Sequence, residues 1–347
     1  SGPDRAKAER LVGEGQVLCD EGDYEAALDR ADQALEADPG YANAYVLRAD
    51  AYTGLGQFDP ALEAAEQAVQ KDSSLSEAYR GRAGVYVAMG RYNEAETDYE
   101  QALKTDAGNH RAHDGRGLLF FDLGEYEKAL REFDQAIDMS SDTAIYYAHR
   151  GGVRREMGEL ERALEDYDAA IAIDHDLPSA HVGRGYTLYL DGKPTRAREA
   201  FIVALGIDPG CVEAYVGRGI VDTDLGLREE AMADFEQAID LDPGCAPAYA
   251  GRGWLYCSKG LYDDALRELN RAVELDPGYF WSYHYRGVSY EKMREYETAI
   301  ADYSKAIEIN PYAAMSYNNR GNCYKAIGNL EAAKADFDKV IELNASH

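Results

Sequence analysis

The sequence predicts an all-α solenoid, in which helix hairpins stack one after another along the chain. A glycine recurs with a period of 34 residues, and only Arg294 interrupts the series. An alanine follows each of these ten positions after five residues, without exception. Ten units fit this period with no insertion or deletion, which is typical of repeat architectures. The glycines are Gly22, Gly56, Gly90, Gly124, Gly158, Gly192, Gly226, Gly260 and Gly328.

Each unit contains two apolar patterns of helical spacing. In residues 246–279 the first pattern places aromatic and small residues at i, i+4 and i+7, and the second, after a turn, places aliphatic and small residues at i, i+4, i+7 and i+8. This spacing predicts two amphipathic helices, A and B. Gly260 stands between them, where a residue free to adopt positive φ ends helix A. Pro277 follows helix B and cannot donate the hydrogen bond that would extend it.

The recurring Tyr, Gly, Ala and Pro columns resemble the tetratricopeptide repeat family over residues 8–345. The resemblance implies a right-handed superhelix whose concave wall is built from the A helices. We expect one array of repeats starting at residues 8, 42, 76, 110, 144, 178, 212, 246, 280 and 314, after a tail or tag remnant at 1–7. Because no polar capping helix follows repeat 10, we expect the native chain to continue or its end to dock.

The composition narrows the class of partner. Sixty-four acidic and thirty-six basic residues give a net charge of -28, which would repel nucleic acid. The charge either serves solubility or attracts a basic partner. Five cysteines without paired spacing are expected to be free thiols in a reducing, cytoplasmic environment. No apolar run of eighteen residues is present, so direct membrane insertion is not expected.

Nine repeats carry an arginine in helix A, at the position occupied by Arg252. The ladder is either a groove for polyanions or part of the framework. Seven of these repeats have an acid sixteen residues later in helix B, and in the other two the acid is one residue earlier, at Glu63 and Glu199. Repeat 1 exchanges the two charges, with Glu14 and Arg30. We therefore predict a partly buried ion pair inside each repeat.

Catalytic motifs are missing, and no enzyme, cofactor or metal site is expected. Gly217-Arg218-Gly219 lies inside a predicted helix without a preceding strand, so it does not predict a dinucleotide site. Asp222-Thr223-Asp224 begins like a calcium loop but has Ala233 at the twelfth position. His113 and His181 occupy a framework tyrosine slot and are interpreted as core substitutes.

A partner is expected on the A helices, whose second, fifth, sixth, ninth, twelfth and thirteenth positions should face the groove. The sixth is often glycine, as at Gly217, which should leave room there. Apolar and aromatic side chains form a band in repeats 6 to 9: Val182, Tyr186, Tyr189, Val216, Ile220, Trp254, Trp281, His284 and Tyr285. The band either anchors a partner or packs on itself. Repeat 10 adds hydrogen-bonding side chains: Asn318, Asn319, Asn322 and Lys325. In repeat 7, Asp222 and Arg228 are expected to pair in place of two framework tyrosines.

The leading hypothesis is a non-enzymatic scaffold or adaptor whose groove takes an extended or amphipathic, basic segment of a protein partner. Two alternatives remain open. One is a regulatory or sensor module of a larger enzyme or signalling protein, and the other is a structural protein that associates through its uncapped ends.

Overall fold

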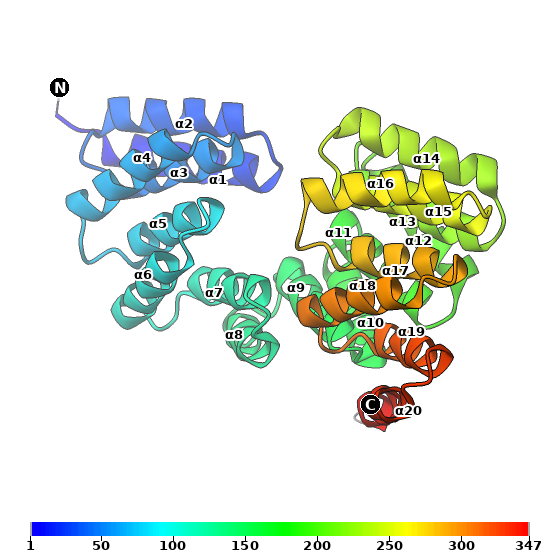
Figure 1. The fold of residues 1–347 in the computed structure, drawn as a ribbon. Coiled ribbons are helices and arrows are strands. Elements are labelled where there is room, and N and C mark those ends of the chain that lie inside the picture. Colours follow the sequence, from blue (N-terminus) through cyan, green and yellow to red (C-terminus); the bar gives the residue numbers. More distant parts are fainter. Residues whose placement is uncertain (1, 346–347) are drawn as a thin grey trace. The chain divides into compact units, whose positions relative to one another are not determined.

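The computed structural model describes residues 2–345, which form twenty α-helices and no strand (Figure 1). It divides into two compact units, residues 1–141 and 142–347, which are described separately. The N-terminal unit contains α1 (Arg5–Asp20), α2 (Tyr24–Ala37), α3 (Ala42–Gly54), α4 (Phe58–Lys71), α5 (Ser76–Ala88), α6 (Tyr92–Thr105), α7 (His110–Asp122) and α8 (Tyr126–Met139).

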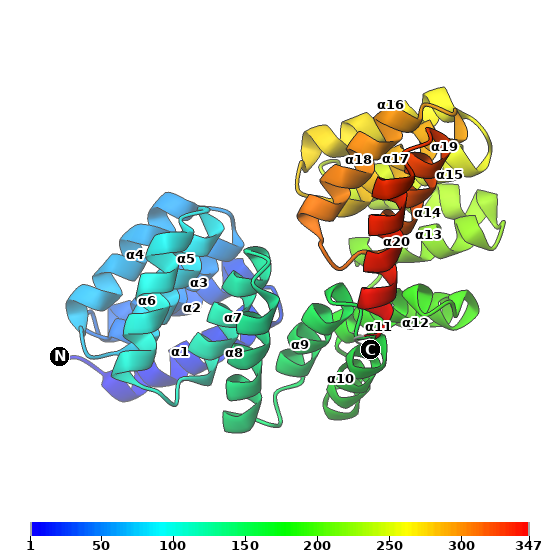
Figure 2. The same ribbon diagram turned by 60° about the horizontal axis from the view of Figure 1, so that its bottom comes forward.

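The C-terminal unit contains the remaining six hairpins (Figure 2). Its helices are α9 (Ala144–Glu156), α10 (Leu160–Ile173), α11 (Pro178–Leu190), α12 (Pro194–Ile207), α13 (Val212–Asp224), α14 (Arg228–Leu241), α15 (Ala246–Ser258), α16 (Tyr262–Leu275), α17 (Phe280–Lys292), α18 (Tyr296–Ile309), α19 (Ala314–Ala326) and α20 (Leu330–Ala345). Each predicted repeat is one hairpin, so the all-α solenoid class is confirmed. The boundary between the units falls at the end of repeat 4, and a single continuous array stays a prediction.

The turn inside each hairpin has the geometry that the glycine column predicts. All nine glycines have φ between 70° and 82°. At Gly56 the chain closes helix α3 with hydrogen bonds from Gly56 N to Thr53 O and from Gln57 N to Tyr52 O. Arg294 adopts the same conformation, with φ 64°, although its side chain makes that conformation unfavourable.

The turn between hairpins depends on an aspartate more than on proline. The Asp38 carboxylate accepts a hydrogen bond from the amide of Gly40, two residues later, at 2.9 Å. Asp106 does the same with Gly108, although alanine replaces the proline between them. The aspartate therefore fixes the turn by accepting from the backbone two residues later, and the turns at Ser73, Ala107 and His175, which lack the proline, keep that hydrogen bond.

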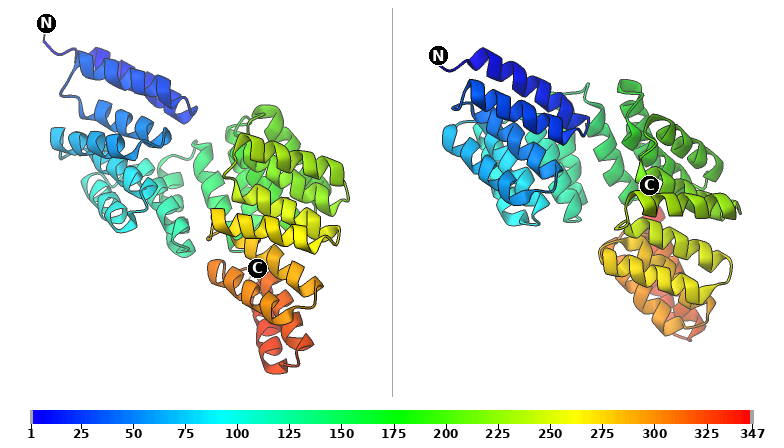
Figure 3. Two further views of the ribbon diagram at one scale, coloured as in Figure 1. Left: turned by 45° about the horizontal axis from the view of Figure 1, so that its top comes forward. Right: turned by 90° about the horizontal axis from the view of Figure 1, so that it is seen from above.

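Within each unit, the A helices form an inner layer and the B helices an outer one (Figure 3). Neighbouring A helices contact each other, as α13 does α15, whereas no two B helices are in contact in the described residues. A layer that is more tightly spaced on one side must curve toward that side. The A helices therefore line the concave face of each unit, as the sequence predicts.

The arginine ladder forms the predicted ion pairs in the seven repeats whose acid lies sixteen residues later. Arg218, for example, donates to both carboxylate oxygens of Asp234 at 2.7 and 2.8 Å. The exchanged pair of Glu14 and Arg30 also forms, at 3.2 Å. In these repeats the ladder thus belongs to the framework of the hairpin. The confirmed arginines are Arg82, Arg116, Arg150, Arg218, Arg252, Arg286 and Arg320.

The pairs predicted for the two remaining repeats are wrong. Arg48 binds Asp32 at 2.5 Å, and Arg184 binds Asp168 at 2.7 Å, each on helix B of the preceding repeat. Glu63 and Glu199 are exposed, because one residue along a helix turns the side chain by about 100°. The arginine position lies between helix B of its own repeat and helix B of the preceding repeat. An arginine that finds no acid on its own helix B therefore pairs with an acid on the preceding one.

The prediction that glycine at the sixth position leaves room in the groove is also wrong. A Cβ on Gly217 would lie 2.3 Å from the Phe201 ring, which belongs to helix B of the preceding repeat. Gly183 meets Tyr167 and Gly251 meets Phe235 in the same way. These glycines accept a buried ring from the neighbouring repeat, and they do not widen the concave face.

Candidate functional site

The predicted band lies on α11, α13, α15 and α17, the inner layer of the C-terminal unit (Figures 1 and 3). Tyr186 and Tyr189 pack against the core cluster that contains Val216 and Ile220. Trp254 and Trp281 pack against the next cluster, around Tyr285. The A helices therefore bring the band residues of successive repeats together along one face.

Five members of the band are buried, with exposed fractions between 1% and 8%: Val182, Val216, Ile220, His284 and Tyr285. These five side chains form the packing beneath the concave surface, which is the second of the two alternatives stated for the band. Tyr186, Tyr189, Trp254 and Trp281 are only partly buried and contribute to the surface itself. Contact of any of these residues with a partner stays a prediction.

The aromatic rings of repeats 8 and 9 stack into a column. Tyr285 lies between the two indoles, with ring centroids 5.1 Å from Trp254 and 5.2 Å from Trp281. The edge of Trp281 also meets His284, whose Nδ1 forms a 2.8 Å hydrogen bond with the Ser316 hydroxyl. Burial lowers the pKa of His284 to about 4, so the ring is neutral at physiological pH.

An acid on repeat 7 joins this column to repeat 6. One carboxylate oxygen of Asp224 accepts from the Tyr189 hydroxyl at 2.5 Å, and the other accepts from Trp254 Nε1 at 2.9 Å. Asp224 is exposed and is the last residue of α13, where the negative end of the helix dipole disfavours an acid. The two donors hold the carboxylate beside the edge of the indole.

A second charged group lies at the end of α9. The Arg155 guanidinium lies 5.7 Å from the centre of the Tyr186 ring and pairs with Glu156 at 2.8 Å. The other oxygen of Glu156 accepts from the Asn310 side chain at 3.4 Å. The end of α9 in repeat 5 thus meets the loop that follows α18 in repeat 9 (Figure 2).

The repeat 10 residues lie on α19. Asn318, Asn322 and Lys325 are exposed and Asn319 is partly buried. The three exposed side chains are available to a partner, and the predicted role of all four is untested.

The predicted band named apolar and aromatic side chains and therefore left out the charged residues of this face. Asp224 and Glu156 occupy the thirteenth position of their repeats and Arg155 the twelfth, so the rule for groove positions includes all three.

The expected pair of Asp222 and Arg228 is wrong. Asp222 is fully buried and binds Arg198 of helix α12 at 2.6 Å, while Arg228 is exposed. Burial raises the pKa of Asp222, and the hydrogen bond from Arg198 opposes that shift.

The two framework histidines make framework contacts. His181 Nε2 bonds the carbonyl of His175 at 2.9 Å, just as the Tyr215 hydroxyl bonds that of Pro209. His113 pairs with Glu132 at 2.7 Å. In residues 2–345, no three His, Cys, Asp or Glu side chains gather in a way that could hold a metal ion. None of the described helices is both long and apolar enough to cross a membrane.

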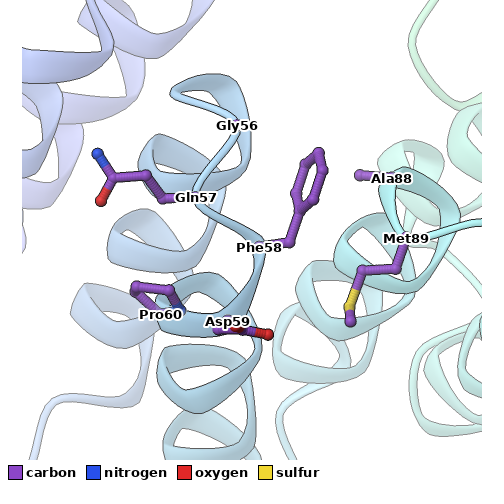
Figure 4. A pocket seen from close by; sticks show the side chains of 7 residues that line it. All are labelled: Gly56, Gln57, Phe58, Asp59, Pro60, Ala88 and Met89. Atoms are coloured by element: carbon purple, nitrogen blue, oxygen red, sulfur yellow. The ribbon is translucent and has the colours of Figure 1, made fainter.

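A cavity of about 580 Å³ opens at the turn edge of the N-terminal unit (Figure 4). Phe58 and Met89 are its large apolar side chains, and Pro60 and Ala88 complete the apolar lining. Phe58 occupies the turn position that is aromatic in most repeats, so the cavity is a consequence of how successive turns stack. It lies outside the predicted groove.

Comparison with known proteins agrees with this architecture. The description "Tetratricopeptide repeat" matches residues 18–85, 80–144, 212–245, 280–312 and 314–347, and "TPR repeat" matches 151–192 and 253–293. No curated protein matches the sequence significantly.

Two solved structures show the same fold. A tetratricopeptide repeat protein of Parabacteroides merdae is 21% identical with a TM-score of 0.55, over 72% of this chain and 99% of its own. The structure described for Pseudomonas aeruginosa pilF is 19% identical with a TM-score of 0.50, over 60% of this chain and 94% of its own. The repeat matches cover most of the chain, and the protein therefore belongs to the tetratricopeptide repeat family, a general protein-interaction scaffold.

Proposed function

We propose that the protein is a non-catalytic scaffold that binds a segment of a protein partner along the inner face of repeats 6 to 9. The observation that carries the proposal is the placement of partly exposed Tyr189, Trp254 and Trp281 on one concave face. A few residues supply most of the binding energy in protein interfaces, and tryptophan and tyrosine are enriched among them. The exposed carboxylate of Asp224 among them favours a basic segment.

The test compares wild type with Trp254→Ala/Tyr189→Ala in a pull-down read by mass spectrometry. Tyr92→Ala/Phe58→Ala is the matched control, because it removes two exposed aromatic rings from the turn edge of the N-terminal unit. We expect the first variant alone to lose partners, with helical circular dichroism unchanged. Identical partner lists for wild type and the groove variant would refute the proposed face.

Self-association is a second candidate, favoured by the apolar outer face of α20. Leu330 and Ile341 are each 67% exposed there, more than any other large apolar side chain in the described residues. Light scattering after size exclusion tests it. A mass that rises with concentration in wild type and stays monomeric in Leu330→Ser/Ile341→Ser supports it, and a monomeric wild type excludes it.

A further inference from the structure

We propose that Trp254, Tyr285, Asp224 and Tyr189 form a site for the guanidinium of an arginine in the partner segment. This site is called the indole–carboxylate site below. The inference rests on the proposed function, since it names the side chain that the concave face recognises. It follows from three features of the face: a flat aromatic surface, a carboxylate fixed at its edge, and a buried hydroxyl that has no partner within residues 2–345.

The flat surface is the stacked column. Trp254 and Tyr285 are nearly parallel, with 17° between their ring planes, and Trp254 remains partly exposed. Indole is the best aromatic acceptor of a cation above its face. A planar guanidinium stacks on such a surface, whereas a lysine ammonium approaches it only as a point charge.

The carboxylate is held in place before any ligand arrives. Each oxygen of Asp224 already accepts one hydrogen bond, from Tyr189 or from Trp254. A carboxylate has about four acceptor positions, so both oxygens can accept a further donor. A guanidinium lying against the indole would have N–H groups in its own plane for that purpose.

The hydroxyl of Tyr285 is the third feature. Tyr285 is 4% exposed, and its oxygen is buried without a hydrogen-bond partner in the described residues. Buried polar groups are nearly always hydrogen-bonded. Asp224 and Tyr189 are among the groups that act electrostatically on this phenol, together with Tyr279 and Tyr186. An N–H donor entering beside Asp224 would satisfy the oxygen.

The same face already holds one guanidinium of the protein itself. Arg155 lies over the Tyr186 ring and pairs with Glu156, which is the combination of aromatic face and carboxylate proposed for the partner's arginine. The net charge of -28 adds long-range attraction for a basic segment. Arginine and lysine carry the same charge, so charge alone does not distinguish them. At this site the planar guanidinium can stack on the indole and donate several N–H groups, which a lysine ammonium cannot do in the same geometry.

The chain has two tryptophans, Trp254 and Trp281, and both lie in the aromatic column, so intrinsic fluorescence reports on the site directly. The probes are three glycine-serine peptides that each carry four spaced arginines, lysines or citrullines. At physiological salt, we expect the arginine peptide to change the fluorescence saturably and to bind about tenfold more tightly than the lysine peptide. The citrulline peptide keeps the shape of the arginine side chain without its charge and should not bind.

Tyr285→Phe is the decisive variant, because it removes only the unpartnered hydroxyl. We expect it to weaken arginine-peptide binding several-fold without lowering the melting temperature. Asp224→Asn should weaken binding about tenfold or more. Asp240→Asn removes the same charge from the exposed face of α14 and should leave binding unchanged.

Equal affinity for the lysine and arginine peptides would overturn the inference, as would full binding by Tyr285→Phe. An equal loss in Asp240→Asn and Asp224→Asn would also overturn it, because the attraction would then be a diffuse charge effect. None of these results affects the proposed function, which fails only if the groove variant keeps all its partners in the pull-down.

Discussion

Glycine at position 217 is predicted to be required for packing between repeats, and substitution by alanine tests this. Phe201 is buried completely, and its ring lies 2.3 Å from the position that a Cβ on Gly217 would occupy. That is 1.1 Å short of the 3.4 Å at which ordinary contact begins (3.4 − 2.3). On its own hairpin the ring occupies the space beside Gly185, where a Cβ would lie 2.9 Å from it.

The magnitude follows from two opposing effects. Alanine is favoured over glycine inside a helix by about 1 kcal/mol. Adding a methyl group to a filled core costs about 1–3 kcal/mol. Gly152→Ala is the matched control, since Gly152 also lies in an A helix of the C-terminal unit and its nearest neighbour, the Tyr167 hydroxyl, is 3.7 Å away. Gly152→Ala should therefore be neutral or stabilising, and Gly217→Ala should be about 1–3 kcal/mol less stable than Gly152→Ala.

Urea unfolding followed by tryptophan fluorescence measures the difference in the unit concerned, because both tryptophans belong to it. With a slope of about 2 kcal/mol per molar urea, the two midpoints should differ by roughly 0.5–1.5 M. Equal shifts of the two midpoints with unchanged slopes would refute the wedged-ring explanation. Circular dichroism of the folded variants controls for loss of helix.

Three further predictions concern stability. Arg294→Gly should increase the free energy of unfolding by about 1 kcal/mol and so raise the melting temperature, because a left-handed backbone is costly for a residue with a Cβ. A lower melting temperature would contradict this. Burial lowers the pKa of His284 from 6.5 to about 4, so the folded state favours the neutral ring. The stability that the neutral His284 ring contributes is complete above pH 6.5 and is lost as the pH falls toward 4. The loss in the free energy of unfolding is at most on the order of 3 kcal/mol. Urea midpoints at pH 7 and pH 5 should therefore differ less in His284→Asn than in wild type, and parallel profiles would exclude the effect. Asp234→Ala should cost about 2 kcal/mol because it leaves a partly buried guanidinium unpaired. Asp168→Ala, whose side chain is 60% exposed, should cost less than about 1 kcal/mol, and equal thermal shifts would show that burial is not the cause.

The sequence by itself determined the contacts that recur inside each hairpin. The period of 34 residues places Gly56 at a left-handed turn and Asp234 opposite Arg218, because both depend on local geometry that each repeat reproduces. The sequence also placed Trp254 and Trp281 on the concave face, since helical spacing assigns each side chain a direction.

Tertiary structure decided how one repeat meets the next. It turned Arg48 back to Asp32, filled the space at Gly217 with the Phe201 ring, and brought Asp224 to Trp254. These contacts join different hairpins, and they depend on the angle and distance at which the hairpins stack. Side-chain volumes at the shared surface set that angle, and a periodic pattern within one repeat does not contain it.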